Sequence, residues 1–185
     1  LCSRDCMVEI EDFWRVDDLI RHKWGKNAFK HVDYCGLDPI RPMKHFGYFC
    51  TPKNSKTFAT TGGDGVHFGF VDGLNIRGTP GPIVMTVPMS DVNNVIVAED
   101  FQEFLSLGYH VGWFALEQIV YDLDAAIDYH SGTDQDMSSE ELQFLEMLRN
   151  ELPIKHIPLT RERLDQLKQD YFDRLDIGTA EGRDK

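Results

Sequence analysis

The sequence predicts an α+β fold with a mainly antiparallel sheet of four to six strands, helices packed on one face of that sheet, and extra C-terminal helices. Segments rich in β-branched and aromatic residues gather in the middle of the chain, and segments with helical periodicity lie before and after them. The connections between the strand segments are short, which favours hairpins over parallel crossovers. We expect one domain over residues 1–178, followed by a frayed tail over residues 179–185.

The N-terminal half predicts one helix and then the sheet. Apolar residues recur at helical spacing over residues 5–24, and Gly25 is well placed to end that helix. Residues 25–46 are expected to be irregular, because their two prolines block a continuous helix. The sheet core is expected over residues 47–98, with strands at residues 47–51, 56–60, 66–71, 83–87 and 94–98.

The C-terminal half predicts helices over residues 100–175. Asp100 can cap a helix that starts at the next residue, and residues 113–130 carry one apolar stripe that indicates a long helix. Ser138 and Glu141 have the spacing of a capping box. Thr160 can cap a last helix with a narrow apolar stripe formed by Leu164, Leu167, Tyr171 and Leu175.

The middle third of the chain resembles the SUKH superfamily in the order and spacing of its short motifs. The matching residues are Phe58, Ala59, Gly62, Gly63 and Asp64, the segment 82–87, and then Asp100, Phe101, Phe104 and Leu105. That superfamily takes in fungal cell-wall-assembly regulators and bacterial immunity proteins against secreted toxins. The resemblance implies an α+β scaffold that binds another protein rather than an enzyme.

The charge of the chain restricts the kinds of partner that it can attract. The net charge is −12, of which residues 1–112 carry −3 and residues 113–185 carry −9. Such a chain is repelled by nucleic acid and by anionic membranes, whose phosphates are bound by Lys and Arg patches. No stretch approaches the roughly 20 apolar residues of a membrane helix. We therefore expect a cytoplasmic protein with a basic protein partner, no nucleic acid and no membrane.

The segment Gly62, Gly63, Asp64 and Gly65 predicts a tight turn between two strands. It lacks the Lys-Ser/Thr and the following helix of a phosphate-binding loop. We expect Gly63 to need a positive φ, so that an alanine there destabilises the fold.

Two residues around this turn, Asp64 and His67, are the candidates for an acid/base pair. Their spacing across the start of a strand predicts that they point to different sides, so we expect no catalytic residue. The alternative is a small hydrolase-like enzyme with a cleft between this turn and the loop over residues 72–82.

The sequence predicts neither a metal nor a cofactor. Cys2 and Cys6 with Cys35 and His45 are a conceivable zinc set, but they lack two tight ligand pairs, so ordinary reduced thiols are expected. Cys50 is expected in an apolar strand. Asp124 and Asp128, one helical turn apart, can share a cation, but such acids more often form a solvated face.

The function predicted from the sequence is a non-enzymatic protein-binding module, an immunity or regulatory protein that masks a basic toxin or partner. The predicted contact is Asp122, Asp124, Asp128, Asp134, Asp136, Glu140 and Glu141. Trp113 and Phe114 are expected in the core, and if exposed they would be interface anchors. The chain is expected to be a monomer or weak homodimer, and a homo-oligomeric structural protein using the last helix remains an alternative.

Overall fold

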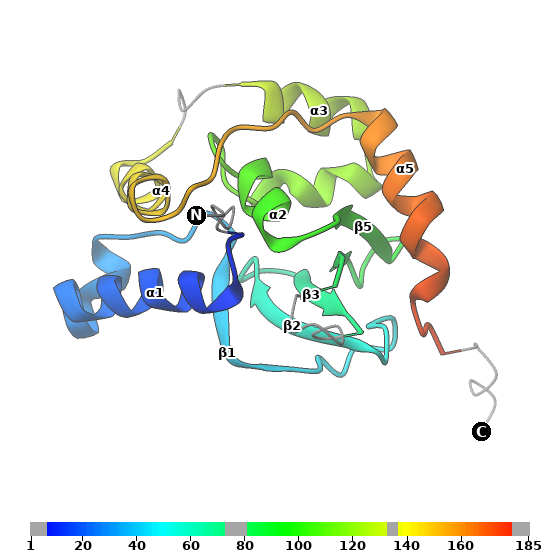
Figure 1. The fold of residues 1–185 in the computed structure, drawn as a ribbon, viewed down its shortest axis with the longest axis horizontal. Helices are drawn as coiled ribbons and strands as arrows, with labels where there is room; N and C mark the ends of the chain where they lie inside the picture. The colour runs from blue at the N-terminus through cyan, green and yellow to red at the C-terminus, as the bar shows by residue number, and fades with distance from the viewer. Residues whose placement is uncertain (1–6, 73–80, 133–136, 179–185) are drawn as a thin grey trace, which may run out of the picture.

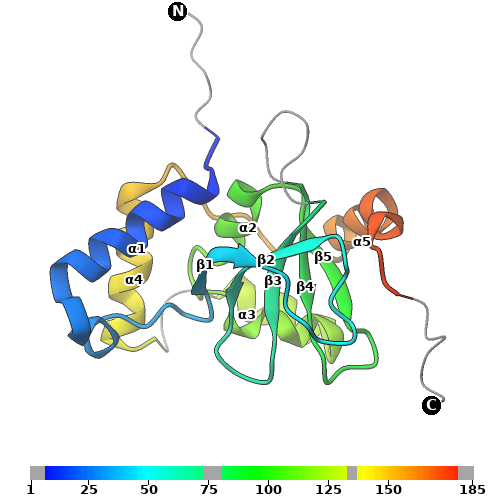
Figure 2. The ribbon, with the colours of Figure 1, turned by 90° about the horizontal axis from the view of Figure 1, so that it is seen from below.

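The fold is built on an antiparallel sheet whose strands lie side by side in sequence order (Figure 2). The computed structural model describes residues 7–72, 81–132 and 137–178. The strands are β1 (Asp38–Lys44), β2 (Ser55–Thr60), β3 (His67–Val71), β4 (Ile83–Thr86) and β5 (Asn94–Ala98). Each strand pairs antiparallel with the next. The predicted α+β class and its antiparallel sheet are confirmed.

Helices precede and follow the sheet. They are α1 (Ile10–Trp24), η1 (Gly25–Lys30), α2 (Phe101–Leu107), η2 (Phe114–Val120), α3 (Leu123–Ser131), α4 (Ser139–Glu151), α5 (Arg161–Tyr171) and η3 (Phe172–Arg174). Helices α1 and α4 lie side by side beyond the β1 edge, while α5 lies at the β5 side (Figures 1 and 2). An ion pair between Arg15 and Glu151 joins α1 to α4.

An aromatic cluster attaches α2 to one face of the sheet. The ring of Phe58 on β2 lies 5.4 Å from the rings of Phe101 and Phe104, both at nearly perpendicular angles. Edge-to-face contacts of this kind add to the free energy gained by burying the rings. On the opposite face, Val84 and Ile96 form a second buried cluster with Leu167 of α5, so the prediction that the helices pack on one face only is wrong.

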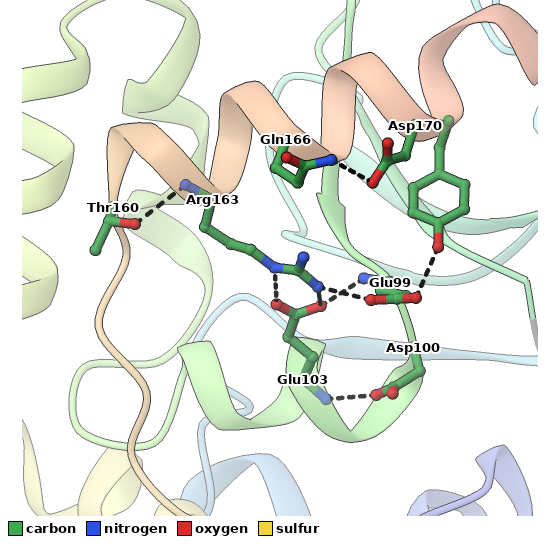
Figure 3. A network of polar contacts seen from close by, with 8 residues as sticks. Glu99, Asp100, Glu103, Thr160, Arg163, Gln166 and Asp170 are labelled. Carbon is green, nitrogen blue, oxygen red and sulfur yellow. Dashed lines mark hydrogen bonds and ion pairs between the residues drawn. The ribbon is translucent and has the colours of Figure 1, made fainter.

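Helix α5 is held by polar contacts as well as by its apolar stripe. Arg163 donates from Nε to Glu103 at 2.6 Å and from Nη2 to Glu99 at 2.9 Å, bridging α5 to the start of α2 (Figure 3). Leu164 and Leu167 are buried. The stripe predicted for a homo-oligomeric contact is therefore largely covered by the chain itself.

The structure corrects the N-terminal elements. Helix α1 begins at Ile10, where Glu9 and Asp12 form a capping box, so residues 7–9 of the predicted helix are not helical, and residues 5 and 6 lie outside the described residues. The segment predicted to be irregular contains η1 and strand β1. β1 tolerates Pro39 and Pro42 because it is an edge strand with a neighbour on one side only.

Two further predictions are wrong. Residues 47–51 form no strand, and Cys50 is buried beside a turn in which the amide of Thr51 donates to Tyr48. The long helix over residues 113–130 is split into η2 and α3, because Asp122 is extended and its side chain accepts from the amide of Ala125. A side chain that caps a new helix competes with continuation of the preceding one. The caps predicted at Asp100, Ser138 and Thr160 are confirmed.

The turn between β2 and β3 uses positive φ at three residues, but Gly63 is not one of them. The φ values are 81° at Gly62, 47° at Asp64 and 74° at Gly65. A Cβ on Gly65 would lie 2.6 Å from the ring of Tyr48, whereas a Cβ on Gly63 would meet nothing within 4 Å. The expected sensitivity of Gly63 to alanine is therefore wrong, and Gly65 takes its place.

We predict that Gly65→Ala lowers the free energy of unfolding by about 1 kcal/mol or more, because a left-handed backbone disfavours a side chain. Gly63→Ala is the matched control and should leave the urea midpoint unchanged or slightly raised. Equal midpoints for the two variants would contradict this account of the turn.

His130 on α3 is buried without a hydrogen bond of good geometry at either ring nitrogen among the described residues. The pKa of His130 is lowered to about 4, mainly by burial and also by the charge of nearby His156, while the carbonyl group of Leu107 acts in the opposite direction. The folded protein therefore holds this ring neutral.

We predict that His130 makes the fold acid-sensitive. The unfolded histidine binds a proton near pH 6.5 and the folded one only near pH 4, so stability is lost as pH falls through that window. Between about pH 7 and about pH 5, the loss from this group is about 2 kcal/mol. In urea unfolding, the free energy of unfolding of His130→Leu should fall by about 2 kcal/mol less than that of the parent between about pH 7 and about pH 5. His22→Leu, a change at an exposed histidine, should show the same fall as the parent. An unchanged pH dependence in His130→Leu would contradict the assignment.

Candidate partner-binding pocket

Two segments far apart in the sequence cross at very short range. The amides of Trp113 and Phe114 both donate to the carbonyl oxygen of Cys35, at 2.8 and 3.1 Å. A Cβ on Gly36 would lie 2.5 Å from the amide nitrogen of Phe114, and one on Gly112 would lie 2.4 Å from the Cβ of Cys35. Both glycines also have positive φ. Only glycine at these two positions allows this crossing without a shift of the backbone.

The crossing sends two adjacent aromatic side chains in opposite directions. Trp113 is fully buried, and its indole Nε1 donates to the carbonyl oxygen of Phe104 at 2.9 Å. Phe114 is 57% exposed. The prediction that both residues lie in the core is right for Trp113 and wrong for Phe114, which has the exposure expected of an interface anchor.

The crossing also forms the floor of a pocket with a volume of about 560 Å³. Its walls come from the end of η1 and the segment that leads from it into β1, the turn between β2 and β3, the start of η2 and the start of α4. The lining residues are Phe29, Val32, Asp33, Tyr34, Cys35, Gly36, Asp38, Thr61, Gly62, Gly63, Phe114 and Glu141. We call this the acidic pocket, because three of these residues are carboxylic acids and none is a base.

The three carboxylates differ in whether hydrogen bonds within the protein stabilise their negative charge. Asp33 accepts from the amide of Cys35 at 2.8 Å, and Glu141 accepts from the amide of Ser138 at 2.7 Å. The backbone of Asp38 pairs with β2, but its carboxylate makes no hydrogen bond or ion pair with the described residues. Burial, and secondarily the charge of Asp33, raise the pKa of Asp38. An added cation would therefore stabilise the carboxylate of Asp38 more than those of Asp33 and Glu141.

The negative potential continues beyond the pocket. Burial and the nearby charge of Asp64 raise the pKa of Glu117 on η2, which places these two carboxylates within electrostatic reach of each other. Among the described residues, Arg149 is a cation whose charge lowers the pKa of Cys35, and its guanidinium donates to the carbonyl oxygen of Tyr109 at 2.8 Å. The acids around the pocket thus outnumber the bases.

One group in the pocket has the composition of a metal site. Among the described residues, ligand atoms of Asp33, Cys35 and Glu141 all lie within 4.8 Å of one another. The Cys35 thiol, however, donates to the carbonyl oxygens of Asp33 and Glu141, and burial raises its pKa. Metal coordination needs the thiolate, which this environment opposes. Of the zinc set considered from sequence, Cys2 and Cys6 lie outside the described residues.

The described members of the predicted contact lie on two helices, α3 and α4, and have different local partners. Asp122 caps α3, and Asp124 forms an ion pair with Arg161 at 2.7 Å. Asp128 is exposed on α3, Glu140 is half-buried in the first turn of α4, and Asp134 and Asp136 lie outside the described residues. Of the described members of this set, Glu141 is the one that lines the pocket.

Sequence reasoning missed the acids that join Glu141 in the pocket, Asp33 and Asp38, and also Phe29. Nothing in the local sequence marks them, because the wall that they form is assembled from segments about a hundred residues apart.

The structure does not bring Asp64 and His67 together. The buried His67 ring lies 3.1 Å from the hydroxyl of Thr51 through Nε2 and 2.8 Å from the carbonyl oxygen of Gly65 through Nδ1. Asp64 is exposed, and residues 73–80 of the proposed cleft lie outside the described residues. Because both ring nitrogens are occupied, His67 is poorly placed to act as a base for a substrate.

No protein-family model, curated protein or solved structure matches this chain. Within the described ranges, no helix has the length and apolar character needed to cross a membrane.

We predict that Asp38→Asn stabilises the protein at neutral pH. Folding raises the pKa of Asp38, so the unfolded chain gives up this proton at a lower pH than the folded protein does. The free energy of unfolding therefore falls as pH rises from the unfolded pKa to the folded pKa, and it stays lower above both values. Urea unfolding near pH 7 should show a higher midpoint for Asp38→Asn, and the gain should shrink near pH 4. A lower midpoint at neutral pH would show that Asp38 has a stabilising partner.

Proposed function

We propose that this chain is a non-enzymatic protein-binding module that masks a basic partner protein through the acidic pocket and the carboxylates around it. The resemblance to the SUKH superfamily supports an immunity or regulatory role, with a toxin domain as one such partner. The proposal keeps the predicted class of function and moves the centre of the contact from α3 to the pocket.

The observation that carries this proposal is the unpartnered, half-buried carboxylate of Asp38 beneath a mouth flanked by exposed aromatic rings. Phe29 is 71% exposed and Phe114 is 57% exposed, yet both rings line the same pocket. Aromatic side chains that are exposed in the free protein and buried in a complex are common energetic centres of interfaces. A carboxylate that raises the energy of the free fold gains stabilisation when a cation arrives.

The net charge of −12 supports the same function at longer range. A surface with this excess of acids steers a basic protein towards it and raises the association rate. Once docked, the module would block the partner's active site or substrate path by occupying the space in front of it. Such masking requires no chemistry from this chain.

We predict that the association rate with the partner falls on the order of tenfold when NaCl is raised from about 50 mM to about 300 mM. The intact chain would be used as bait in extract from its source organism, and each captured protein would be purified for stopped-flow measurement. A basic protein that binds with this salt dependence, and whose own activity is inhibited at a one-to-one ratio, supports the proposal.

A captured partner that is acidic, or one whose association rate is indifferent to salt, contradicts the proposal. Turnover of a partner or small molecule by the chain itself would also contradict it, since masking is stoichiometric.

A further inference from the structure

The residues that line the acidic pocket indicate which class of ligand it can bind. The carboxyl groups of Asp33 and Asp38, from one segment, and of Glu141, from the start of α4, line one volume of about 560 Å³. No Lys, Arg or His is among the lining residues. An anion would therefore be repelled by these carboxylates, and a neutral group could donate hydrogen bonds but would leave Asp38 without a counter-charge.

The aromatic rings favour one kind of cation. Phe29 and Phe114 stand at the mouth, and the ring of Tyr34 lies in the wall with its centre 6.1 Å from that of Phe29. A guanidinium is planar, stacks on aromatic faces, and presents several N–H donors in a fork that matches carboxylates. Its apolar stem would lie against the rings while its head reaches the acids.

A bare metal ion fits less well. Three ligand atoms come together in the described part of the pocket, but one of them is the Cys35 sulfur, whose hydrogen is donated to two backbone carbonyl oxygens. Divalent zinc would have to remove that proton, and calcium prefers six or more oxygen ligands. An organic cation needs neither the thiolate nor a complete coordination sphere.

We propose that the acidic pocket binds one arginine side chain of the basic partner, with its guanidinium between the carboxylates of Asp38 and Glu141 and its stem against Phe29 and Phe114. This inference rests on the proposed function, because the arginine is supplied by the masked protein. It adds a single anchoring contact to what would otherwise be diffuse charge attraction. The raised pKa of Asp38 in the free protein agrees with a site that lacks its cation.

The first test uses a small probe, so that it does not depend on finding the partner. N-acetyl-L-arginine amide would be titrated into the ¹⁵N-labelled full chain, with N-acetyl-L-citrulline amide as the neutral probe of nearly the same shape. Amide shifts are expected with arginine at Cys35, Gly36, Gly62 and Phe114, and not with citrulline. Equal shifts with citrulline, shifts confined to other residues, or no shifts would overturn the inference.

Matched variants then separate the pocket from general charge. The pocket variant carries Asp33→Asn, Asp38→Asn and Glu141→Gln, which retain the accepting oxygens that the amides of Cys35 and Ser138 use. The control carries Asp122→Asn, Asp124→Asn and Asp128→Asn on α3, an equal change of charge in which asparagine can still cap the helix. The pocket variant should weaken binding of the arginine probe at least tenfold, and the control should change it less than twofold.

The same pair of variants distinguishes failure of this inference from failure of the proposed function. If a basic partner binds with salt-dependent kinetics and the two variants weaken it equally, the module function stands and the arginine anchor is overturned. If the pocket variant alone speeds dissociation of the partner tenfold or more, the anchor is supported. Tight binding of zinc or calcium that displaces the arginine probe would assign the pocket to a metal and overturn the inference.

Discussion

The close crossing of residues 35–36 over residues 112–114 is the constraint on which the rest of the structure depends. One carbonyl oxygen, that of Cys35, accepts hydrogen bonds from two consecutive amides, and two glycines allow the backbones to approach. Because consecutive residues then point to opposite sides, Trp113 enters the core and Phe114 faces outward. The floor of the pocket and the packing of the core are thus fixed by the same contacts.

The acids of this chain serve different physical purposes, although the sequence shows only their number. Asp100 and Asp122 cap helices, Glu99 and Glu103 hold α5 through Arg163, and Asp38 has no partner among the described residues. Capping and ion-paired acids contribute to the stability of the fold. An unpaired, half-buried acid lowers that stability, and residues of this kind are common at functional sites because function needs the charge.

Local signals allowed much of the fold to be predicted, and non-local contacts explain what was missed. The strands β2 to β5 have β-branched and aromatic residues, and the caps at Asp100, Ser138 and Thr160 depend on neighbours within three residues. Strand β1 was missed because tolerance of its prolines depends on its place at the sheet edge. The pocket was missed for the same reason: no short segment contains both Asp38 and Glu141, so their proximity exists only in the folded chain.

The contacts that hold the pocket together are separate from the side chains that face its interior. The frame consists of backbone hydrogen bonds at Cys35 and of the space left by Gly36 and Gly112, none of which depends on the side chains that face the pocket. The exposed rings of Phe29 and Phe114 can therefore be exchanged for other side chains while the crossing beneath them is retained. Surface substitutions away from buried contacts change stability little. A scaffold of this kind can acquire new partners by changing the mouth of the pocket while its core stays the same.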